Sequence, residues 1–150
     1  MLDAHHVGDD GRKTQNLVVQ SVKRKVKNQN AKTKTELSHR TYRYSIKVVE
    51  FLDSLPQDVV TGVIARQLLR SATSVGANLV EAKGASSKRD FTNYFTIALK
   101  SANETLYWLG LLRDGKKIDN DELRFLLTET KELANILGSS ILTLKGKRQL

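Results

Sequence analysis

The chain has 150 residues, of which 39% are hydrophobic and 27% are charged, so it is long enough for one domain with a buried core. It contains no cysteine, which excludes disulfide bonds, a thiolate nucleophile and a cysteine-based zinc site. No apolar stretch approaches the ~20 residues that a membrane-spanning helix needs, and the N-terminus lacks a hydrophobic signal region. We therefore expect a cytoplasmic protein.

The formal net charge of +9 is densest in the N-terminal quarter. Residues 1–40 hold nine Lys and Arg against four Asp and Glu, a net of +5, whereas residues 41–150 hold sixteen against twelve, a net of +4. Such an excess favours acidic partners, with nucleic acid first among them. A solubilising tail has the same composition, so both interpretations stay open.

Residues 1–38 differ in composition from the rest of the chain. The segment 22–36, VKRKVKNQNAKTKTE, is basic, rich in amides and poor in large apolar side chains. Such a segment buries too little surface to offset the entropy lost on ordering. We predict two parts: a basic, mostly disordered extension over residues 1–38 and a folded domain over residues 39–150.

Helical periodicity begins near residue 39. The spacing of 4, 3 and 3 between Tyr42, Ile46, Val49 and Leu52 predicts the buried face of a first helix. The segment 54–58, SLPQD, ends this helix and begins the next one. The buried faces predicted for the second and third helices consist of Ile64, Leu68, Val75, Leu79 and Ala82, and of Phe91, Phe95, Ala98, Ala102, Thr105, Leu109 and Leu112.

A heptad repeat marks the fourth helix. Leu123, Thr130, Leu137 and Leu144 recur every seven residues, which favours packing like that of a coiled coil. Four amphipathic helices joined by short turns predict an all-α fold, an up-down-up-down antiparallel four-helix bundle. No segment shows sustained alternation with a period of two, so we expect no sheet.

A polar stripe runs beside the apolar face of the second helix. Its members recur at spacings of 3, 4, 4 and 3, and they are Gln67, Arg70, Ser74, Asn78 and Glu81. Half-buried polar groups need partners, and Glu104 on the third helix is a candidate partner for Arg70. The stripe is either a hydrogen-bonded seam that sets helix register or subunit packing, or the lining of a small polar site. We favour the seam, because no matched acid, base and nucleophile accompany it.

The sequence indicates no catalytic or metal site. Helical bundles hold di-metal centres with Glu-x-x-His pairs, but Tyr107 stands three residues after Glu104. The histidines, His5, His6 and His39, lie outside the predicted bundle or at its edge. We therefore expect no catalytic residue, metal, cofactor or small-molecule substrate, and no membrane contact.

The cations form the other candidate site. In an antiparallel bundle the turn between helices two and three lies at the same end as the C-terminus, which predicts one basic end. Phosphate binding by such a patch is independent of base sequence and weakens with salt. The candidate nucleic-acid contacts are Lys23, Arg24, Lys25, Lys27, Lys32, Lys34, Lys88, Arg89, Lys145, Lys147 and Arg148.

Two segments carry a family resemblance: residues 67–91, QLLRSATSVGANLVEAKGASSKRDF, and residues 95–112, FTIALKSANETLYWLGLL. They resemble the bacterial proteins encoded in intervening sequences of 23S ribosomal RNA genes, and the likeness covers residues 41–145. The long basic N-terminal extension departs from the family pattern. The matching positions include Gln67, Arg70, Ser74, Asn78, Glu81, Asp90, Phe91, Glu104 and Trp108.

The resemblance implies a four-helix bundle that assembles as a ring-shaped homopentamer. A related branch of the family, the accessory protein of diversity-generating retroelements, binds nucleic acid and partners a reverse transcriptase. We therefore expect a non-enzymatic, oligomeric bundle that binds RNA or DNA through a basic surface. The alternative is a structural or adaptor module that binds a protein partner, for example a reverse transcriptase, and has no direct nucleic-acid role.

Overall fold

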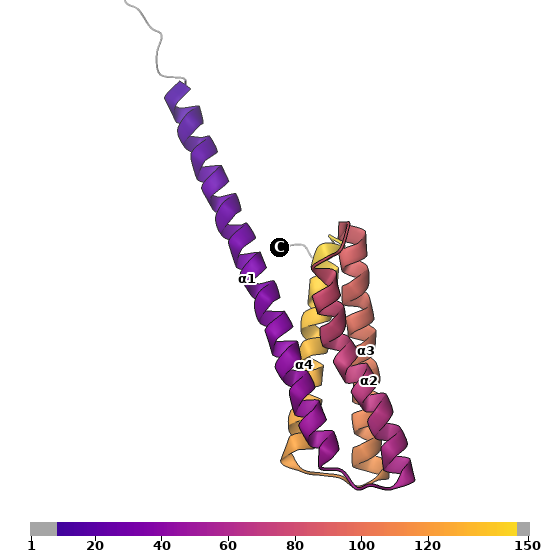
Figure 1. Ribbon diagram of the computed structural model, residues 1–150. Coiled ribbons are helices and arrows are strands. Elements are labelled where there is room, and N and C mark those ends of the chain that lie inside the picture. The colour runs from indigo at the N-terminus through magenta and orange to yellow at the C-terminus, as the bar shows by residue number, and fades with distance from the viewer. Residues whose placement is uncertain (1–8, 147–150) are drawn as a thin grey trace, which may run out of the picture. The chain divides into compact units, whose positions relative to one another are not determined.

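A computed structural model describes residues 9–146, which form four helices connected by short turns (Figure 1). The helices are α1 (Asp9–Asp53), α2 (Val59–Ala82), α3 (Lys88–Gly115) and α4 (Asp121–Leu144). These residues include no strand, so the predicted all-α fold is confirmed. The chain divides into two compact units, Met1–Leu37 and Ser38–Leu150, and the division falls within α1.

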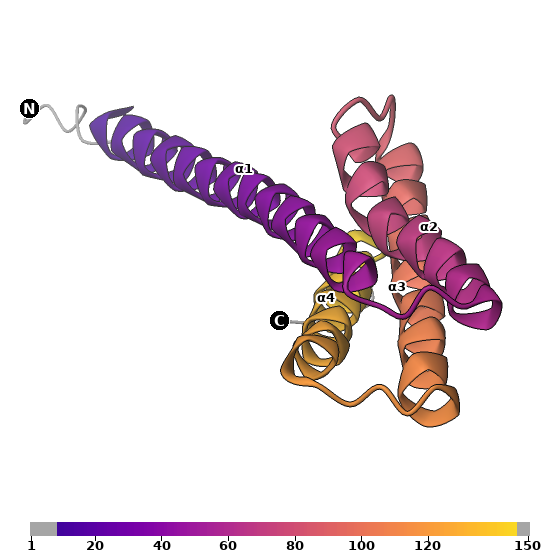
Figure 2. The same ribbon diagram turned by 60° about the horizontal axis from the view of Figure 1, so that its bottom comes forward.

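In the second unit, the neighbouring helices are antiparallel. The Ser71 hydroxyl of α2 and the Thr105 hydroxyl of α3 are hydrogen-bonded at 3.0 Å. The Tyr44 hydroxyl of α1 and the Thr130 hydroxyl of α4 are hydrogen-bonded at 2.6 Å. The C-terminal part of α1 also lies close to α2, since a Cβ atom added to Gly76 would stand 3.4 Å from the Thr41 hydroxyl oxygen. Figure 2 shows this up-down-up-down arrangement of the predicted bundle.

The core of the bundle is built mainly from leucine. The predicted faces of α2, α3 and α4 supply it: Leu68, Leu109, Leu123 and Leu137 are completely buried. Burying one such side chain contributes roughly 1.5–3 kcal/mol. Among the described residues, six serines and threonines are buried as well, and each has a hydrogen-bond partner; they are Thr41, Thr61, Ser71, Ser101, Thr105 and Thr130.

The predicted buried face of the first helix was wrong. Tyr42, Ile46 and Val49 are 65%, 42% and 44% exposed, and Leu52 is half-buried. The buried residues of this stretch are instead Thr41, Tyr44, Val48, Phe51 and Leu55. Both sets recur at helical spacing, on opposite sides of α1, so periodicity by itself does not identify the side that the bundle covers.

The N-terminal extension, predicted to be mostly disordered, is helical from residue 9 onward, because α1 begins at Asp9 and is continuous to Asp53. The part of the prediction that concerns residues 1–8 lies outside the described residues. Side chains 11–36 are all exposed, so burial does not hold this segment in a helix. Two other causes account for it. Its Lys, Arg, Gln and Ala residues have high helix propensity, and a helix that extends an existing one needs no new nucleus.

The turns of the bundle are fixed by helix caps. Asp58 accepts a hydrogen bond from the Thr61 backbone N–H at 3.0 Å, and this bond is the main reason that the pKa of Asp58 lies well below its usual value. Ser87 caps α3 through the Asp90 backbone N–H at 3.0 Å. Asn120 caps α4 through the Leu123 backbone N–H at 2.9 Å.

Candidate nucleic-acid interface and the polar seam

The polar stripe of α2 meets α3. Ser74 and Ser101 are hydrogen-bonded at 2.9 Å, and the Asn78 side-chain amide donates to the Ser74 carbonyl at 2.8 Å and to its hydroxyl at 3.1 Å. Arg70 donates to Glu104 at 3.1 Å, the partner proposed from the sequence. The Trp108 ring N–H donates to the same Glu104 oxygen at 3.2 Å.

Two members of the stripe have a different environment. Gln67 is half-buried and Glu81 is exposed, and neither makes a side-chain hydrogen bond or ion pair within residues 9–146. Arg70 is also exposed at the outer edge of the stripe. The paired middle of the stripe therefore has the geometry of a seam between two helices, while Glu81 at one end faces solvent and Gln67 at the other end is half-buried.

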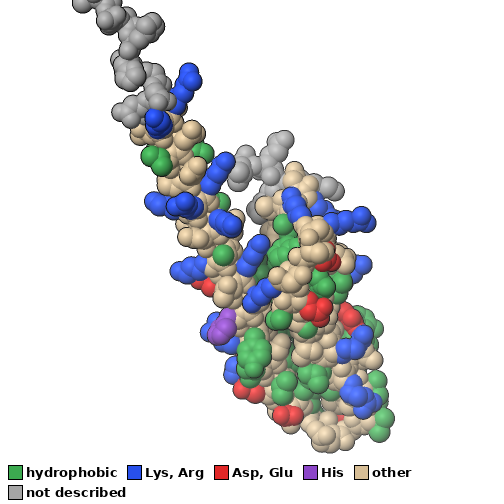
Figure 3. Space-filling model, turned by 45° about the horizontal axis from the view of Figure 1, so that its top comes forward, with side chains coloured by type: hydrophobic (Ala, Val, Ile, Leu, Met, Phe, Trp, Pro, Cys, Tyr) green, Lys and Arg blue, Asp and Glu red, His purple; other side chains and the backbone are tan. Residues whose placement is uncertain are grey.

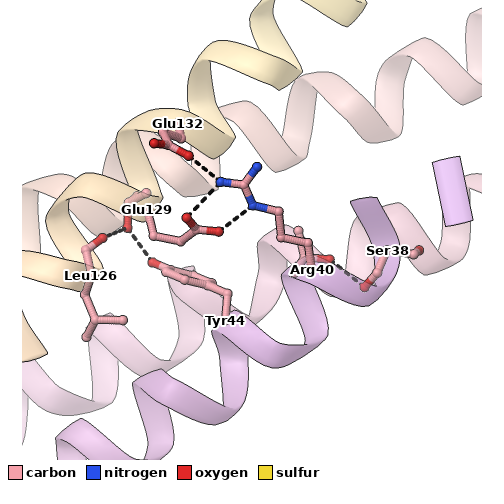
Figure 4. A network of polar contacts seen from close by, with 8 residues as sticks. Ser38, Arg40, Tyr44, Leu126, Glu129 and Glu132 are labelled. Carbon is pink, nitrogen blue, oxygen red and sulfur yellow. Dashed lines mark hydrogen bonds and ion pairs between the residues drawn. The ribbon is translucent and has the colours of Figure 1, made fainter. Parts of the chain in front are cut away.

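A cluster that sequence analysis missed joins α1 to α4 (Figure 4). The Arg40 Nε and Nη2 atoms donate to the two oxygens of Glu129 at 2.6 and 2.8 Å, and Glu132 accepts a further bond from Nη2. The Glu129 carboxylate is the main cause of the raised pKa of Arg40. The partners lie about ninety positions apart in the sequence, so no local spacing could have revealed the cluster.

Tyr44 lies beside this cluster (Figure 4). Its hydroxyl is 2.6 Å from the Thr130 hydroxyl, which itself donates to the Leu126 carbonyl at 2.5 Å. Since Thr130 has a single hydroxyl proton, Tyr44 acts as the donor in their shared bond. Burial of the ring is the main cause that raises the pKa of Tyr44 to about 12.

The cations predicted to share one end of the bundle do come together there. Lys88 and Arg89 of the first turn of α3 and Lys145, the residue after α4, line one shallow concavity. All three side chains are exposed, and none forms an ion pair with another described residue. Asp90 also lines the concavity, but its carboxylate accepts the Ser86 backbone N–H at 3.0 Å. Lys147 and Arg148 lie outside the described residues.

The remaining candidate cations belong to the first unit. They lie on the N-terminal half of α1 and are all exposed: Lys23, Arg24, Lys25, Lys27, Lys32 and Lys34. In this unit, side chains 11–37 include eight Lys and Arg and one acidic residue, Glu36. The candidate nucleic-acid residues therefore form two separate groups, one in each unit.

Within residues 9–146, no three His, Cys, Asp or Glu side chains are placed to hold a metal ion together. No helix among the same residues has the length and apolar character required to cross a bilayer. His5 and His6 precede the described residues.

The comparisons with known proteins agree with the resemblance drawn from the sequence. The family model for the 23S rRNA-intervening sequence protein matches residues 33–139. The chain belongs to this family. No curated protein matches it.

A crystal structure has the same fold: a protein with unknown function from the S23 ribosomal protein family of Bacteroides thetaiotaomicron. It is 35% identical in sequence, its alignment covers 70% of this chain and 97% of its own, and the TM-score is 0.65. Membership of the family identifies the fold but assigns no reaction. The family match begins at residue 33, so most of the first unit lies outside it.

Proposed function

We propose that this member of the family is a non-enzymatic, oligomeric bundle that binds RNA or DNA through its exposed cations. The observation that supports this most strongly is the basic end of the bundle, where Lys88, Arg89 and Lys145 line one concavity without an acidic side-chain partner among the described residues. Cations that are close together and unpaired are arranged to bind phosphate groups rather than to stabilise the fold.

The position of Lys88 and Arg89 adds to this argument. Both lie in the first turn of α3, where the helix dipole is positive and a cation is unfavourable by a few tenths of a kcal/mol. A phosphate placed between these side chains and the start of the helix would interact favourably with both. The exposed lysines and arginines of the N-terminal half of α1 offer a second set of phosphate contacts, which likewise would not select a base sequence.

The oligomeric part of the proposal is supported by a second apolar face on α1. Tyr42, Ile46 and Val49 recur at spacings of 4 and 3 and are exposed, on the side opposite the buried residues. A second copy of the chain would cover them. The homopentamer implied by the family resemblance is the assembly we propose.

The experiment is a salt titration of binding to a labelled RNA hairpin and a labelled DNA duplex. If nucleic acid is bound, the logarithm of the affinity falls linearly with that of the salt concentration, by roughly 0.9 per phosphate contact. Replacing Lys88, Arg89 and Lys145 by Gln would then lower the slope by about 2–3.

A matched control changes three other exposed cations, Arg66, Lys100 and Lys131, to Gln. They lie at least a dozen residues along their helices from the basic end, so the net charge falls equally while the site stays intact. Absence of binding at low salt, or an affinity that does not respond to salt, would refute the proposal.

A further inference from the structure

The N-terminal half of α1 carries an apolar face that nucleic-acid binding leaves unexplained. Val18, Val19, Val22 and Val26 occupy a sector of about 100° around the helix axis, and each is 49–56% exposed. At the same rotation per residue, every Lys and Arg of residues 11–37 lies outside this sector. Figure 3 shows hydrophobic side chains between the cations along this part of α1.

The sector follows the heptad pattern of a coiled coil. Val19, Val22, Val26, Gln29 and Thr33 are spaced 3, 4, 3 and 4, which places Val19 and Val26 at a positions and Val22 at a d position. Val at a is typical of two-stranded coiled coils in which Leu occupies d. In this chain Val22 and Gln29 occupy the d positions, so the partner helix would supply the Leu. We call residues 18–33 of this face the valine seam.

The positions beside the valine seam identify the kind of partner. In this register Lys23 occupies an e position, and Lys25 and Lys32 occupy g positions; none of the e or g positions between residues 18 and 32 is acidic. A second copy of the same helix would offer no carboxylate at its own e and g positions, so none of these lysines would gain an ion pair. A helix with Glu or Asp at these positions would instead form an ion pair at each one.

A groove along the helix supports the same assignment. It is lined by Val22 and Val26 on one side and by Lys23, Lys27 and Asn30 toward the other. An apolar side chain of a partner helix would contact the valine methyl groups in this groove. A neighbouring Glu or Asp of the same partner would reach the lysines beside them. Helices that lie on membranes use Trp, Phe and Leu on their apolar face, whereas the valine seam offers only Val.

We propose that the valine seam docks an acidic amphipathic helix of a partner protein, as one strand of a two-stranded coiled coil. This inference goes beyond nucleic-acid binding, since it concerns the valine face rather than the cations alone. It also gives the N-terminal unit a role that does not depend on the family's bundle.

The test uses the full-length protein and two synthetic helical peptides of 21 residues. Both carry Val at a and Leu at d; one has Glu and the other has Lys at all e and g positions. We expect the Glu peptide to bind at least tenfold more tightly than the Lys peptide. Equal binding of the two peptides, or no binding of either, would overturn the proposal.

Variants separate the valine seam from charge alone. Replacing Val22 and Val26 by Ser keeps every cation, and both positions are exposed, so the fold should persist. We expect this variant to lose tenfold or more in affinity for the Glu peptide. Leu17→Ser is the matched control, because Leu17 is 67% exposed and lies outside the sector. Equal losses in both variants would also overturn the proposal.

Three further measurements distinguish other occupants. Light scattering that shows a smaller assembly for the double Val→Ser variant would assign the seam to a second copy. Loss of binding to phosphatidylserine vesicles, without loss of peptide binding, would assign it to a membrane. Weaker RNA binding by this variant would assign it to nucleic acid. We expect none of these changes, and any of them would contradict an acidic helix as the occupant.

Discussion

The two parts of α1 are helical for different reasons. In residues 11–36 every side chain is exposed, whereas Tyr44, Val48 and Phe51 in the later part are buried. The first part depends on helix propensity and on its continuity with an existing helix, and the second depends on packing. The same secondary structure therefore gives no indication of how strongly a segment is held, and substitutions should have different effects in the two parts.

The largest expected difference concerns apolar side chains. Phe51→Ala should lower the free energy of unfolding by about 3–5 kcal/mol, because it leaves a cavity in the core. Val26→Ala on the same helix should change it by less than ~0.5 kcal/mol, since this side chain is half exposed. Urea denaturation of both variants measures the difference. Similar losses would show that the valine face is covered in solution.

Proline substitutions compare the backbone in the two parts. Ser45→Pro should destabilise the bundle by about 3 kcal/mol, because it removes a helical hydrogen bond and forces a kink in a packed helix. Ala31→Pro should instead reduce the helical circular dichroism signal while leaving the urea midpoint of the bundle unchanged. A lower midpoint in Ala31→Pro would mean that the N-terminal part of α1 supports the bundle.

Alkaline pH should weaken the packed part of α1 through Tyr44. Its pKa is raised to about 12 in the folded protein, so the unfolded chain loses this proton first, near pH 10. The stability contributed by the neutral phenol is complete below pH 10 and is lost as the pH rises through 12, at up to about 1.4 kcal/mol per pH unit.

Tyr44→Phe is the control for this titration. The variant should be about 1 kcal/mol less stable than the wild type at neutral pH, because it lacks the hydrogen bond to Thr130. This difference in the free energy of unfolding should shrink above pH 10, because only the wild type loses stability there as Tyr44 ionises. A gap that stays constant up to pH 12 would show that Tyr44 ionises equally easily in both states.

An effect smaller than those of the core and proline substitutions separates two arginines of α1. Arg40→Gln leaves the largely buried Glu129 without its cation and should cost about 1–2 kcal/mol. Arg43→Gln should cost less than ~0.5 kcal/mol, because Arg43 is exposed and has no ion pair with another described residue. Thermal unfolding of the two variants gives the comparison, and equal shifts would mean that the α1–α4 cluster adds nothing to stability.

Sequence reasoning succeeded where one helix face was clearly more apolar than the other. In α2, α3 and α4 the leucine positions identified the side that is buried. In α1 it failed because Tyr42, Ile46 and Val49 form a second face as apolar as the covered one. The disorder prediction failed for a related reason: composition treats residues 22–36 as an isolated peptide, whereas they extend a helix that packing supports further along.

The candidate site shows the same limit. The spacing of the polar stripe and its partner Glu104 could be predicted, since each depends on one helix and its neighbour. The contacts of Ser74 with Ser101 and of Arg40 with Glu129 depend on how deeply two helices approach, which a sequence pattern does not specify. The basic end could be predicted because antiparallel topology alone brings Lys88 and Lys145 together.

The helices α1 and α2 approach each other closely at Gly76, because this residue has no side chain to hold them apart. A glycine inside a helix costs about 1 kcal/mol relative to alanine, and an alanine methyl here would just touch Thr41. Any side chain larger than alanine would collide with Thr41 and push α1 away from α2. The distance between α1 and α2 at this level therefore depends on the absence of a side chain, and variation among related chains at position 76 should be confined to glycine and alanine.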